Sequence, residues 1–258
     1  VLTPIAILAS YSVQERVKAY MILFLLLETG MLGVFLALDL LLFFVFWEIG
    51  LVPMYFLINQ WGSEKGERQL WGGLKVSART YASFKFMIYT MAGSLGLLLA
   101  IQMIGVTSGT FDLPELFKIW PGLTSLQGVP LGIPIATVKA VAFWAFVVAF
   151  AIKVPVWPFH TWLPDAHSQA PSGISAMLSG IVIETGLIAM LRALSTLVLT
   201  EYSWGPVILG FGAVNMLLGN LMALRQTQVK RLLAYSSISH MGYILLGIGA
   251  AITFGHAN

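Results

Sequence analysis

Residues 151–164 read Ala-Ile-Lys-Val-Pro-Val-Trp-Pro-Phe-His-Thr-Trp-Leu-Pro, and this stretch decides the fold. A largely apolar run that starts at Ile135 leads into it, and such a run forms a membrane-spanning helix. Proline interrupts a helix because it removes a backbone hydrogen bond, so three prolines within ten residues predict a discontinuous helix directly after Lys153. In transporters, a broken helix marks the path of an ion. The alternative is an ordinary helix end followed by a polar turn.

The composition excludes a soluble fold unless partner proteins cover nearly the whole surface. Of 258 residues, 58% are hydrophobic and 10% are charged, and the mean hydropathy is +0.87. A globular domain carries about a quarter charged residues, and a disordered chain is polar and strongly charged. The chain has no cysteine, which excludes disulfides and thiolate-bound zinc or iron–sulfur clusters. We therefore expect an integral membrane protein.

Seven stretches are apolar enough to cross a bilayer as helices, each of which needs about 20 residues. They predict an all-α, polytopic transmembrane helix bundle in a single domain, residues 1–258. The predicted spans are Ala19–Ala37, Leu40–Gln60, Tyr81–Ile104, Ile135–Trp157, Ala170–Leu194, Ser203–Leu224 and Leu232–Phe254. The chain begins with Val1 rather than Met and ends at Asn258 directly after a span, so we expect a partial chain.

The charges between the spans predict an orientation, because lysine and arginine collect in cytoplasmic loops. The segment before the first span, the loop 61–81 and the turn between the sixth and seventh spans are basic. With seven spans these regions share one side, which makes loop 61–81 cytoplasmic and loop 105–134 periplasmic. The N-terminal end of the chain is then cytoplasmic, in a bacterial inner membrane. Loop 105–134 is expected to contain an amphipathic interfacial helix, and Arg79 and Lys85 to flank the basic loop.

Four ionisable residues inside the predicted spans carry most of the functional information. Glu28 lies in the first span, Glu48 in the second, Lys153 in the fourth and Glu184 in the fifth. A charge in hydrocarbon costs at least about 2.5–3.5 kcal/mol, so such groups face protein or water. Burial disfavours the charged form of each group and mutual attraction favours it. One lysine and several glutamates on separate helices therefore suit a proton relay.

Simpler explanations stay open for these residues. Glu28 would have a purely structural role if it hydrogen-bonds a neighbouring helix. Glu48 and Lys153 would form a static ion pair that holds two helices together, although buried pairs add little stability. A metal site is not predicted, because no His-x-x-x-His pairing occurs on one helical face. The side chains considered for it are His160, His167, Asp165 and Glu184.

Three stretches resemble the antiporter-like membrane subunits of respiratory complex I, the NADH:quinone oxidoreductase. The most specific resemblance lies in residues 151–172. They consist of the stretch 151–164 quoted above, followed by Asp-Ala-His-Ser-Gln-Ala-Pro-Ser. Residues 230–242 read Lys-Arg-Leu-Leu-Ala-Tyr-Ser-Ser-Ile-Ser-His-Met-Gly and carry the second. Residues 44–55 read Phe-Val-Phe-Trp-Glu-Ile-Gly-Leu-Val-Pro-Met-Tyr and, with residues 84–95, look most like the subunit M (chain 4) branch.

The resemblance implies a fold of 14 helices with two inverted five-helix repeats, of which this chain covers roughly helices 4 to 10. It implies that Glu48 and Lys153 form the proton site. It also implies that His240 matches the histidine that the family carries in its Ser-His-Met-Gly motif. Such subunits bind no metal or cofactor themselves, and flavin, iron–sulfur clusters and quinone belong to partner subunits. The implied partners are other membrane-arm subunits, including further antiporter-like ones, in a lipid bilayer and without nucleic acid.

Two positions depart from the family pattern. Glu184 stands where relatives usually carry a lysine on the eighth helix, and Gln228 stands at or next to a usual aspartate. A glutamate can also carry a proton, but its ionised form is negative where that of lysine is positive, and this negative charge favours protonated Lys153. The relay is therefore either retuned here, or this copy pumps poorly.

The sequence thus predicts a proton-translocating subunit of NADH:quinone oxidoreductase, an enzyme whose redox chemistry lies outside this chain. Lys153 is the expected central carrier, Glu48 the group that modulates it and Glu184 the next station. The remaining relay residues are His160, His240 and Glu28. Two alternatives stay open: a subunit of a multi-subunit cation/proton antiporter or membrane-bound hydrogenase-type complex, and a scaffold subunit that has lost pumping.

Overall fold

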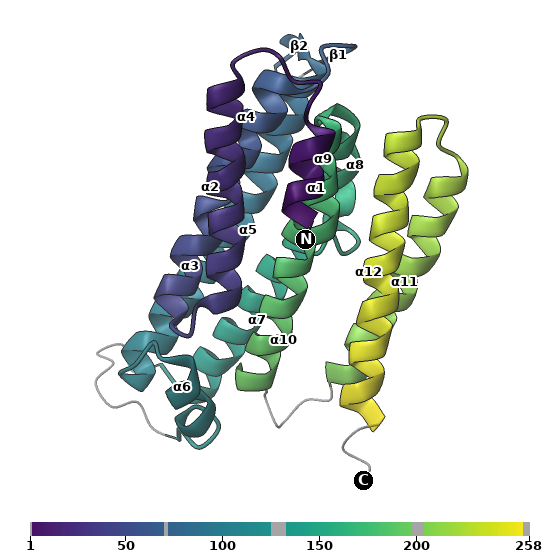
Figure 1. Cartoon of the computed structure of the whole chain (residues 1–258). Helices are drawn as coiled ribbons and strands as arrows, with labels where there is room; N and C mark the ends of the chain where they lie inside the picture. The colour runs from purple at the N-terminus through teal and green to yellow at the C-terminus, as the bar shows by residue number, and fades with distance from the viewer. Residues whose placement is uncertain (1, 70–71, 125–132, 198–203, 255–258) are drawn as a thin grey trace.

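The structure is a computed structural model that describes residues 2–69, 72–124, 133–197 and 204–254. Within these ranges the chain forms a helix bundle with one short β-hairpin (Figure 1). Seven of the described helical segments are long and apolar enough to cross a membrane, which confirms the predicted transmembrane bundle. The elements are α1 (Leu2–Ala9), α2 (Val17–Leu36), α3 (Leu40–Ile49), α4 (Leu51–Trp61), β1 (Glu67–Gln69), β2 (Lys75–Ser77), α5 (Ala78–Ser108), α6 (Leu113–Ile119), α7 (Ile135–Lys153), α8 (Trp162–Gln169), α9 (Ser172–Met177), α10 (Ile183–Leu197), α11 (Trp204–Leu224) and α12 (Val229–Phe254).

Three of the predicted spans are interrupted rather than continuous. The second consists of α3 and α4, which meet at Gly50, because Pro53 has no amide hydrogen for the carbonyl four residues earlier. The fourth ends at Lys153 instead of the predicted Trp157, and the helix resumes in α8. The fifth contains a π-helical turn, Leu178–Val182, between α9 and α10. The predicted start of the sixth span, Ser203, lies outside the described residues.

Two described elements do not follow from the apolar patterns of the sequence. Helix α1 packs against α9, where Gly173 leaves room for the backbone of Ala6. Ser10, just beyond α1, shares a hydrogen bond of 2.8 Å with Tyr20 of α2. Strands β1 and β2 pair antiparallel inside loop 61–81. The loop predicted there from its charges is therefore an exposed hairpin, whose sequence lacks the apolar alternation that predicts strands.

The helix expected in loop 105–134 is present as α6. Asp112 begins it by accepting a hydrogen bond of 2.9 Å from the amide of Glu115, and Leu113 and Leu116 are buried on one face. Asp39 begins α3 in the same way, by accepting hydrogen bonds from the amides of Leu41 and Leu42. Residues 125–132 of this loop lie outside the described part of the chain.

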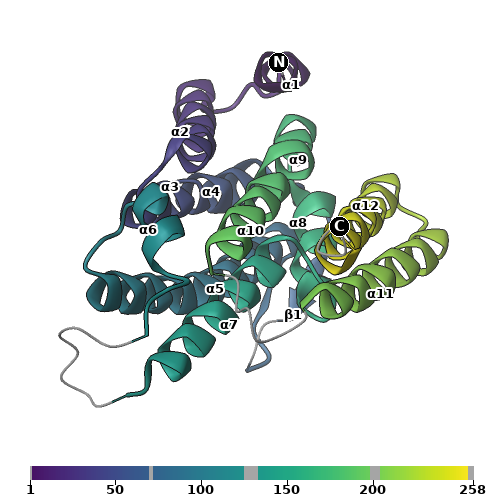
Figure 2. The ribbon, with the colours of Figure 1, turned by 90° about the horizontal axis from the view of Figure 1, so that it is seen from below.

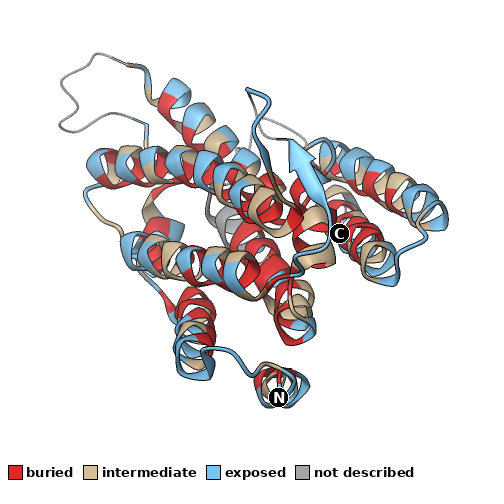
Figure 3. Ribbon diagram, turned by 90° about the horizontal axis from the view of Figure 1, so that it is seen from above, coloured by how far each residue is buried: buried red, intermediate tan, exposed pale blue. Residues whose placement is uncertain are grey.

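The helices are arranged as one larger group with a two-helix pair beside it. In Figures 1 and 2, α2 to α7 and α10 form the larger group, and α11 and α12 stand together next to α8. Figure 3 shows that the long helices turn buried residues inward and exposed residues outward. Many outward residues are large and apolar, among them Leu32, Leu36, Leu95 and Leu99. An apolar outer surface of this kind is the one that lipid chains contact.

The three basic regions of the described chain lie at one end of the bundle. The turn before α2, the β1–β2 hairpin and the turn between α11 and α12 are all at the top of Figure 1. Helix α8 also ends there, since the carbonyl of Gln169 accepts a hydrogen bond of 2.9 Å from the amide of Ser63. The charge pattern of the sequence therefore agrees with the helix directions.

Helices α11 and α12 pack backbone against backbone along a seam of glycines. Gly205, Gly212 and Gly219 recur every seven residues in α11, and Gly242 and Gly249 do so in α12. A Cβ atom on Gly212 would lie 2.8 Å from a backbone nitrogen of α12. Small residues allow this close approach in membranes, where van der Waals contact drives helix association.

The seam predicts the stability of two alanine variants. Gly212→Ala should destabilise the protein by about 1–3 kcal/mol, because the added methyl group pushes backbone away. Gly210→Ala is the matched control, since a Cβ there meets no atom within 4 Å and alanine favours a helix. The measurement is the thermal unfolding midpoint of the detergent-solubilised protein. Equal midpoints for the two variants would contradict close packing at the seam.

Candidate functional site

The helix that carries Lys153 is broken immediately after this residue. Pro155 and Pro158 have no amide hydrogen, and the amide of Val156 reaches back to the carbonyl of Ala151 at 2.8 Å. The chain then makes a short 3₁₀ turn before α8 begins. The discontinuous helix that the prolines predict is therefore present, and its break lies directly beside the lysine.

Two side chains from other parts of the sequence bind backbone groups at this break. The indole nitrogen of Trp162 donates a hydrogen bond of 2.9 Å to the carbonyl of Ile152. Asn215, fully buried in α11, accepts a hydrogen bond of 2.8 Å from the amide of Trp157. The sequence analysis missed Asn215. The signal that was available is an amide side chain inside an apolar span, which is costly to bury unless it is hydrogen-bonded.

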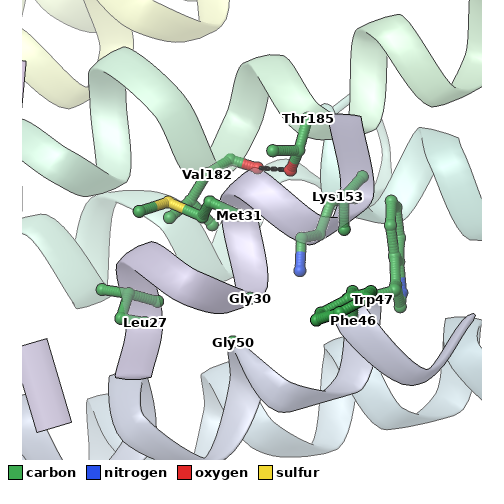
Figure 4. A pocket seen from close by; sticks show the side chains of 10 residues that line it. Leu27, Gly30, Met31, Phe46, Trp47, Gly50, Lys153, Val182 and Thr185 are labelled. Atoms are coloured by element: carbon green, nitrogen blue, oxygen red, sulfur yellow. Dashed lines mark hydrogen bonds between the residues drawn. The ribbon is translucent and has the colours of Figure 1, made fainter. Parts of the chain in front are cut away.

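The Lys153 side chain is buried, with 5% of its surface exposed. Its Nζ lies 4.6 Å from the centroid of the Trp47 ring, a cation–π distance, and the Trp47 indole donates a hydrogen bond of 3.2 Å to Ser94. Figure 4 shows the amine pointing into a pocket between α2, α3 and α10. The pocket has an empty volume of about 270 Å³, and its lining includes Leu27 and Phe46.

Glu48 is the acidic neighbour of this amine. It follows Trp47 in α3, it is half-buried, and its charge acts on Lys153. Its Oε1 atom is buried without a hydrogen-bond partner. The ion pairs of the described residues do not include a direct Glu48–Lys153 contact, so the static pair that the sequence left open is absent there. A buried carboxylate oxygen without a partner is a place for a water molecule or a proton.

The structure does not bring Glu28 or Glu184 into the pocket. Glu28 is half-buried on α2, and Glu184 is exposed on α10. The next residue, Thr185, lines the pocket instead, and its hydroxyl donates a hydrogen bond of 2.7 Å to the carbonyl of Val182. Glu48 does not line the pocket either, but of the three glutamates chosen from the sequence it is the one whose charge acts on the lysine.

The two candidate histidines lie away from the Lys153 pocket. His160 is in the 3₁₀ turn, and its Nδ1 atom is buried without a hydrogen-bond partner. It lines a second pocket of about 180 Å³ together with Asn215 and Tyr235. His240 is exposed on α12, with its ring centroid 6.5 Å from that of Tyr243. His160 is thus next to the break, and His240 is not.

Asp165 of α8 is a second polar centre, which the sequence analysis considered only for a metal site. Its carboxylate lies 2.7 Å from the Nζ of Lys85 and 3.4 Å from the guanidinium of Arg231. Lys85 was expected to flank the basic loop, but α5 begins at Ala78, so Lys85 lies inside the helix and faces α8. Arg79 does remain at the loop, where it pairs with Glu64 at 2.7 Å.

The side chains around the Lys153 pocket are suited to acid–base chemistry. An amine and a carboxyl group exchange protons readily when small movements change their separation. Among the described residues, no three His, Asp or Glu side chains gather in a way that would hold a metal ion. The nitrogen Nδ1 of His167, considered above for such a site, lies 2.6 Å from the hydroxyl of Ser175.

Curated relatives cover almost all of this chain. The NADH-quinone oxidoreductase subunit M of Rhodobacter capsulatus is 39% identical over 97% of this chain and 46% of its own length. The NAD(P)H-quinone oxidoreductase chain 4 2 of Thermosynechococcus vestitus is 38% identical over 95% of this chain and 42% of its own length. This chain therefore spans less than half the length of these relatives.

Solved structures of three kinds of membrane complex contain a similar chain. Respiratory complex I from Thermus thermophilus gives a TM-score of 0.78 at 30% identity, covering 97% of this chain and 48% of the other. The archaeal membrane-bound sulfane sulfur reductase gives 0.78 at 27% identity, covering 98% and 40%. The Mrp complex from Dietzia sp. gives 0.68 at 27% identity, covering 88% and 38%.

The family match covers most of the chain, including Glu48, Lys153, the broken helix and the α11–α12 pair. It extends over residues 37–257, and the family is described as NADH:quinone oxidoreductase/Mrp antiporter, TM. The curated relatives and the solved structures above agree with this match. The chain therefore belongs to the NADH:quinone oxidoreductase/Mrp antiporter transmembrane family.

Proposed function

We propose that this chain is part of a proton-translocating membrane-arm subunit of NADH:quinone oxidoreductase, with Lys153 as its central proton carrier. The observation that carries the proposal is the burial of the Lys153 amine beside a broken helix, where it points into a pocket lined by Trp47, the residue before Glu48 (Figure 4). In this proposal quinone reduction in partner subunits drives the protonation changes from a distance. The residues of this chain then move protons and carry out no redox chemistry.

The proposed mechanism depends on two opposed effects on the Lys153 amine. Burial favours its neutral form, whereas a nearby carboxylate and the face of an aromatic ring favour its charged form. Glu48 and Trp47 belong to α3, and Lys153 to α7. A small movement of one helix relative to the other therefore changes the balance, and the lysine releases or takes up a proton.

The remaining relay residues are proposed to extend this centre. His160, which lines the pocket on the other side of the break, would connect Lys153 to a route for proton uptake or transfer. Glu184 would be the next station towards the outer face of α10, where it is exposed. Glu28 and His240 would lie at the ends of proton routes that continue beyond the described residues.

The proposed setting is a bacterial inner membrane, with the N-terminal end of this chain on the cytoplasmic side. The gathering of the basic regions at one end of the bundle supports this orientation (Figure 1), because basic loops stay cytoplasmic. We place this chain at roughly helices 4 to 10 of a 14-helix fold, beside other membrane-arm subunits. Flavin, iron–sulfur clusters and quinone would be bound by partner subunits, with no metal, cofactor or nucleic acid bound here.

A cation/proton antiporter or membrane-bound hydrogenase-type complex is the second candidate. The similarity to the Mrp complex from Dietzia sp., at a TM-score of 0.68, supports this second candidate. Purification of the native assembly separates the two candidates. Flavin and iron–sulfur subunits that purify with this chain would support the oxidoreductase, and their absence from an active assembly would support the antiporter.

Lys153→Ala should lower coupled quinone reduction and proton translocation by about tenfold or more, since positioned acid–base groups contribute about 10²–10⁴-fold. The measurement is proton uptake per electron in inverted membrane vesicles that contain the assembled complex. Lys139→Ala is the matched control, because Lys139 lies near the other end of α7 and donates to the carbonyl of Pro121 at 3.2 Å. Unchanged rate and stoichiometry in Lys153→Ala would favour a scaffold subunit.

Glu48→Gln should impair coupled activity strongly and leave the assembly intact. The amide keeps the size of the side chain but removes the negative charge that acts on Lys153. The control is Glu64→Gln, whose carboxylate is 75% exposed in the loop before β1. Quantitative blotting of the assembled complex accompanies the activity assay. Loss of assembly with Glu48→Gln would instead indicate a structural role.

Glu184→Gln tests the proposed next station. It should reduce proton translocation while quinone binding and assembly stay normal, because glutamine occupies the same space and cannot carry a proton. Glu184→Lys, which restores the residue that relatives usually have, should retain translocation. If Glu184→Gln behaves like the unmodified protein, the relay does not pass through this residue.

A further inference from the structure

Asn215 is a buried amide that the proton relay proposed above does not use. It lies near the middle of α11, and its exposed fraction is 0%. The other asparagine of this helix, Asn220, is exposed. A primary amide buried among apolar side chains is costly unless its oxygen and nitrogen both find partners. The partners of Asn215 therefore explain why the bundle contains it.

Those partners are backbone groups of the broken helix. The Oδ1 of Asn215 accepts a hydrogen bond of 2.8 Å from the amide of Trp157. Its Nδ2 donates to the carbonyl of Pro155 at 3.3 Å. Both residues lie within four positions of Lys153, so one side chain of α11 holds the segment that follows the lysine.

The bond to Trp157 replaces one that an unbroken helix would contain. In an α-helix each amide donates to the carbonyl four residues earlier, and for Trp157 that carbonyl belongs to Lys153. Here the amide turns to Asn215 instead. Backbone groups inside a membrane must all be paired, so without this acceptor the amide of Trp157 would lack a partner or return to Lys153.

We propose that Asn215 is a positioning residue for Lys153, which holds the helix open after the lysine and thereby keeps its amine directed into the pocket. Its role in transport rests on the function proposed above. The same Nδ2 also lies 3.4 Å from the carbonyl of Ile238 in α12. Movement of the α11–α12 pair is therefore transmitted through Asn215 to the backbone next to the proton carrier.

The test compares Asn215→Leu with Asn220→Leu in the complete subunit within its assembled complex. Leucine has the same branching as asparagine but is larger and offers no hydrogen bonds, so Asn215→Leu removes the clamp and keeps the branched shape of the side chain. Coupled proton translocation should fall about tenfold to a hundredfold, as a misplaced reacting group does. The pH at half-maximal translocation should also move, whereas Asn220→Leu should leave both quantities unchanged.

Hydrogen–deuterium exchange gives a readout that does not depend on activity. Residues 154–159 contain two prolines, so few amides contribute, and the amide of Trp157 is the one bound to Asn215. It should exchange slowly in the unmodified complex and about tenfold faster in Asn215→Leu. Fast exchange of this amide in the unmodified complex would overturn the proposal, even if the leucine variant fails to assemble.

The remaining outcomes are also decisive. Translocation within about twofold of the unmodified complex in Asn215→Leu would overturn the positioning role, as would lost translocation with unchanged exchange. If Lys153→Ala leaves translocation unchanged, the proposed function fails, while slow exchange of the Trp157 amide would still support the clamp itself. The two proposals therefore fail in distinguishable ways.

Discussion

The amine of Lys153 lies among apolar side chains, and the structure around it supplies what water would otherwise provide. The face of Trp47 lies 4.6 Å away, the charge of Glu48 acts on it, and a small pocket leaves space in front of it. These three features come from α3 and from α10, which packs against both α7 and α2. The bundle is therefore arranged so that a charge that is costly to bury can be accommodated.

The same requirement applies to the backbone at the break. The prolines after Lys153 remove helical hydrogen bonds, and Trp162 and Asn215 bind groups that are released there. Asp165 then ties α8 to α5 and α12 through Lys85 and Arg231. Both halves of the broken helix therefore pack against α5, while α7 also contacts α10 and α8 also contacts α12.

Much of the fold could be predicted from the sequence, because span length, apolar composition and proline position are local properties. The seven spans and the break after Lys153 are confirmed, as is the family. The interruption at Gly50 was not foreseen, although Pro53 marks it in the sequence, and the hairpin in loop 61–81 was not foreseen because its strands lack an apolar alternation. For the candidate site, the sequence pointed to Lys153 and Glu48 because charged residues stand out in apolar spans. It did not point to Asn215, since the role of Asn215 depends on a partner 58 residues away.

The π-helical turn Leu178–Val182 has a consequence for which side chain faces the lysine. A π-turn holds one residue more than an α-turn. Each residue after it therefore points in about the direction that the preceding residue would have in a regular α-helix. With α9 held in place and an ordinary α-turn in this segment, the direction now taken by Thr185 would belong to Glu184. The wide turn thus decides whether α10 presents a hydroxyl or a carboxyl group to the Lys153 pocket, without a change in sequence.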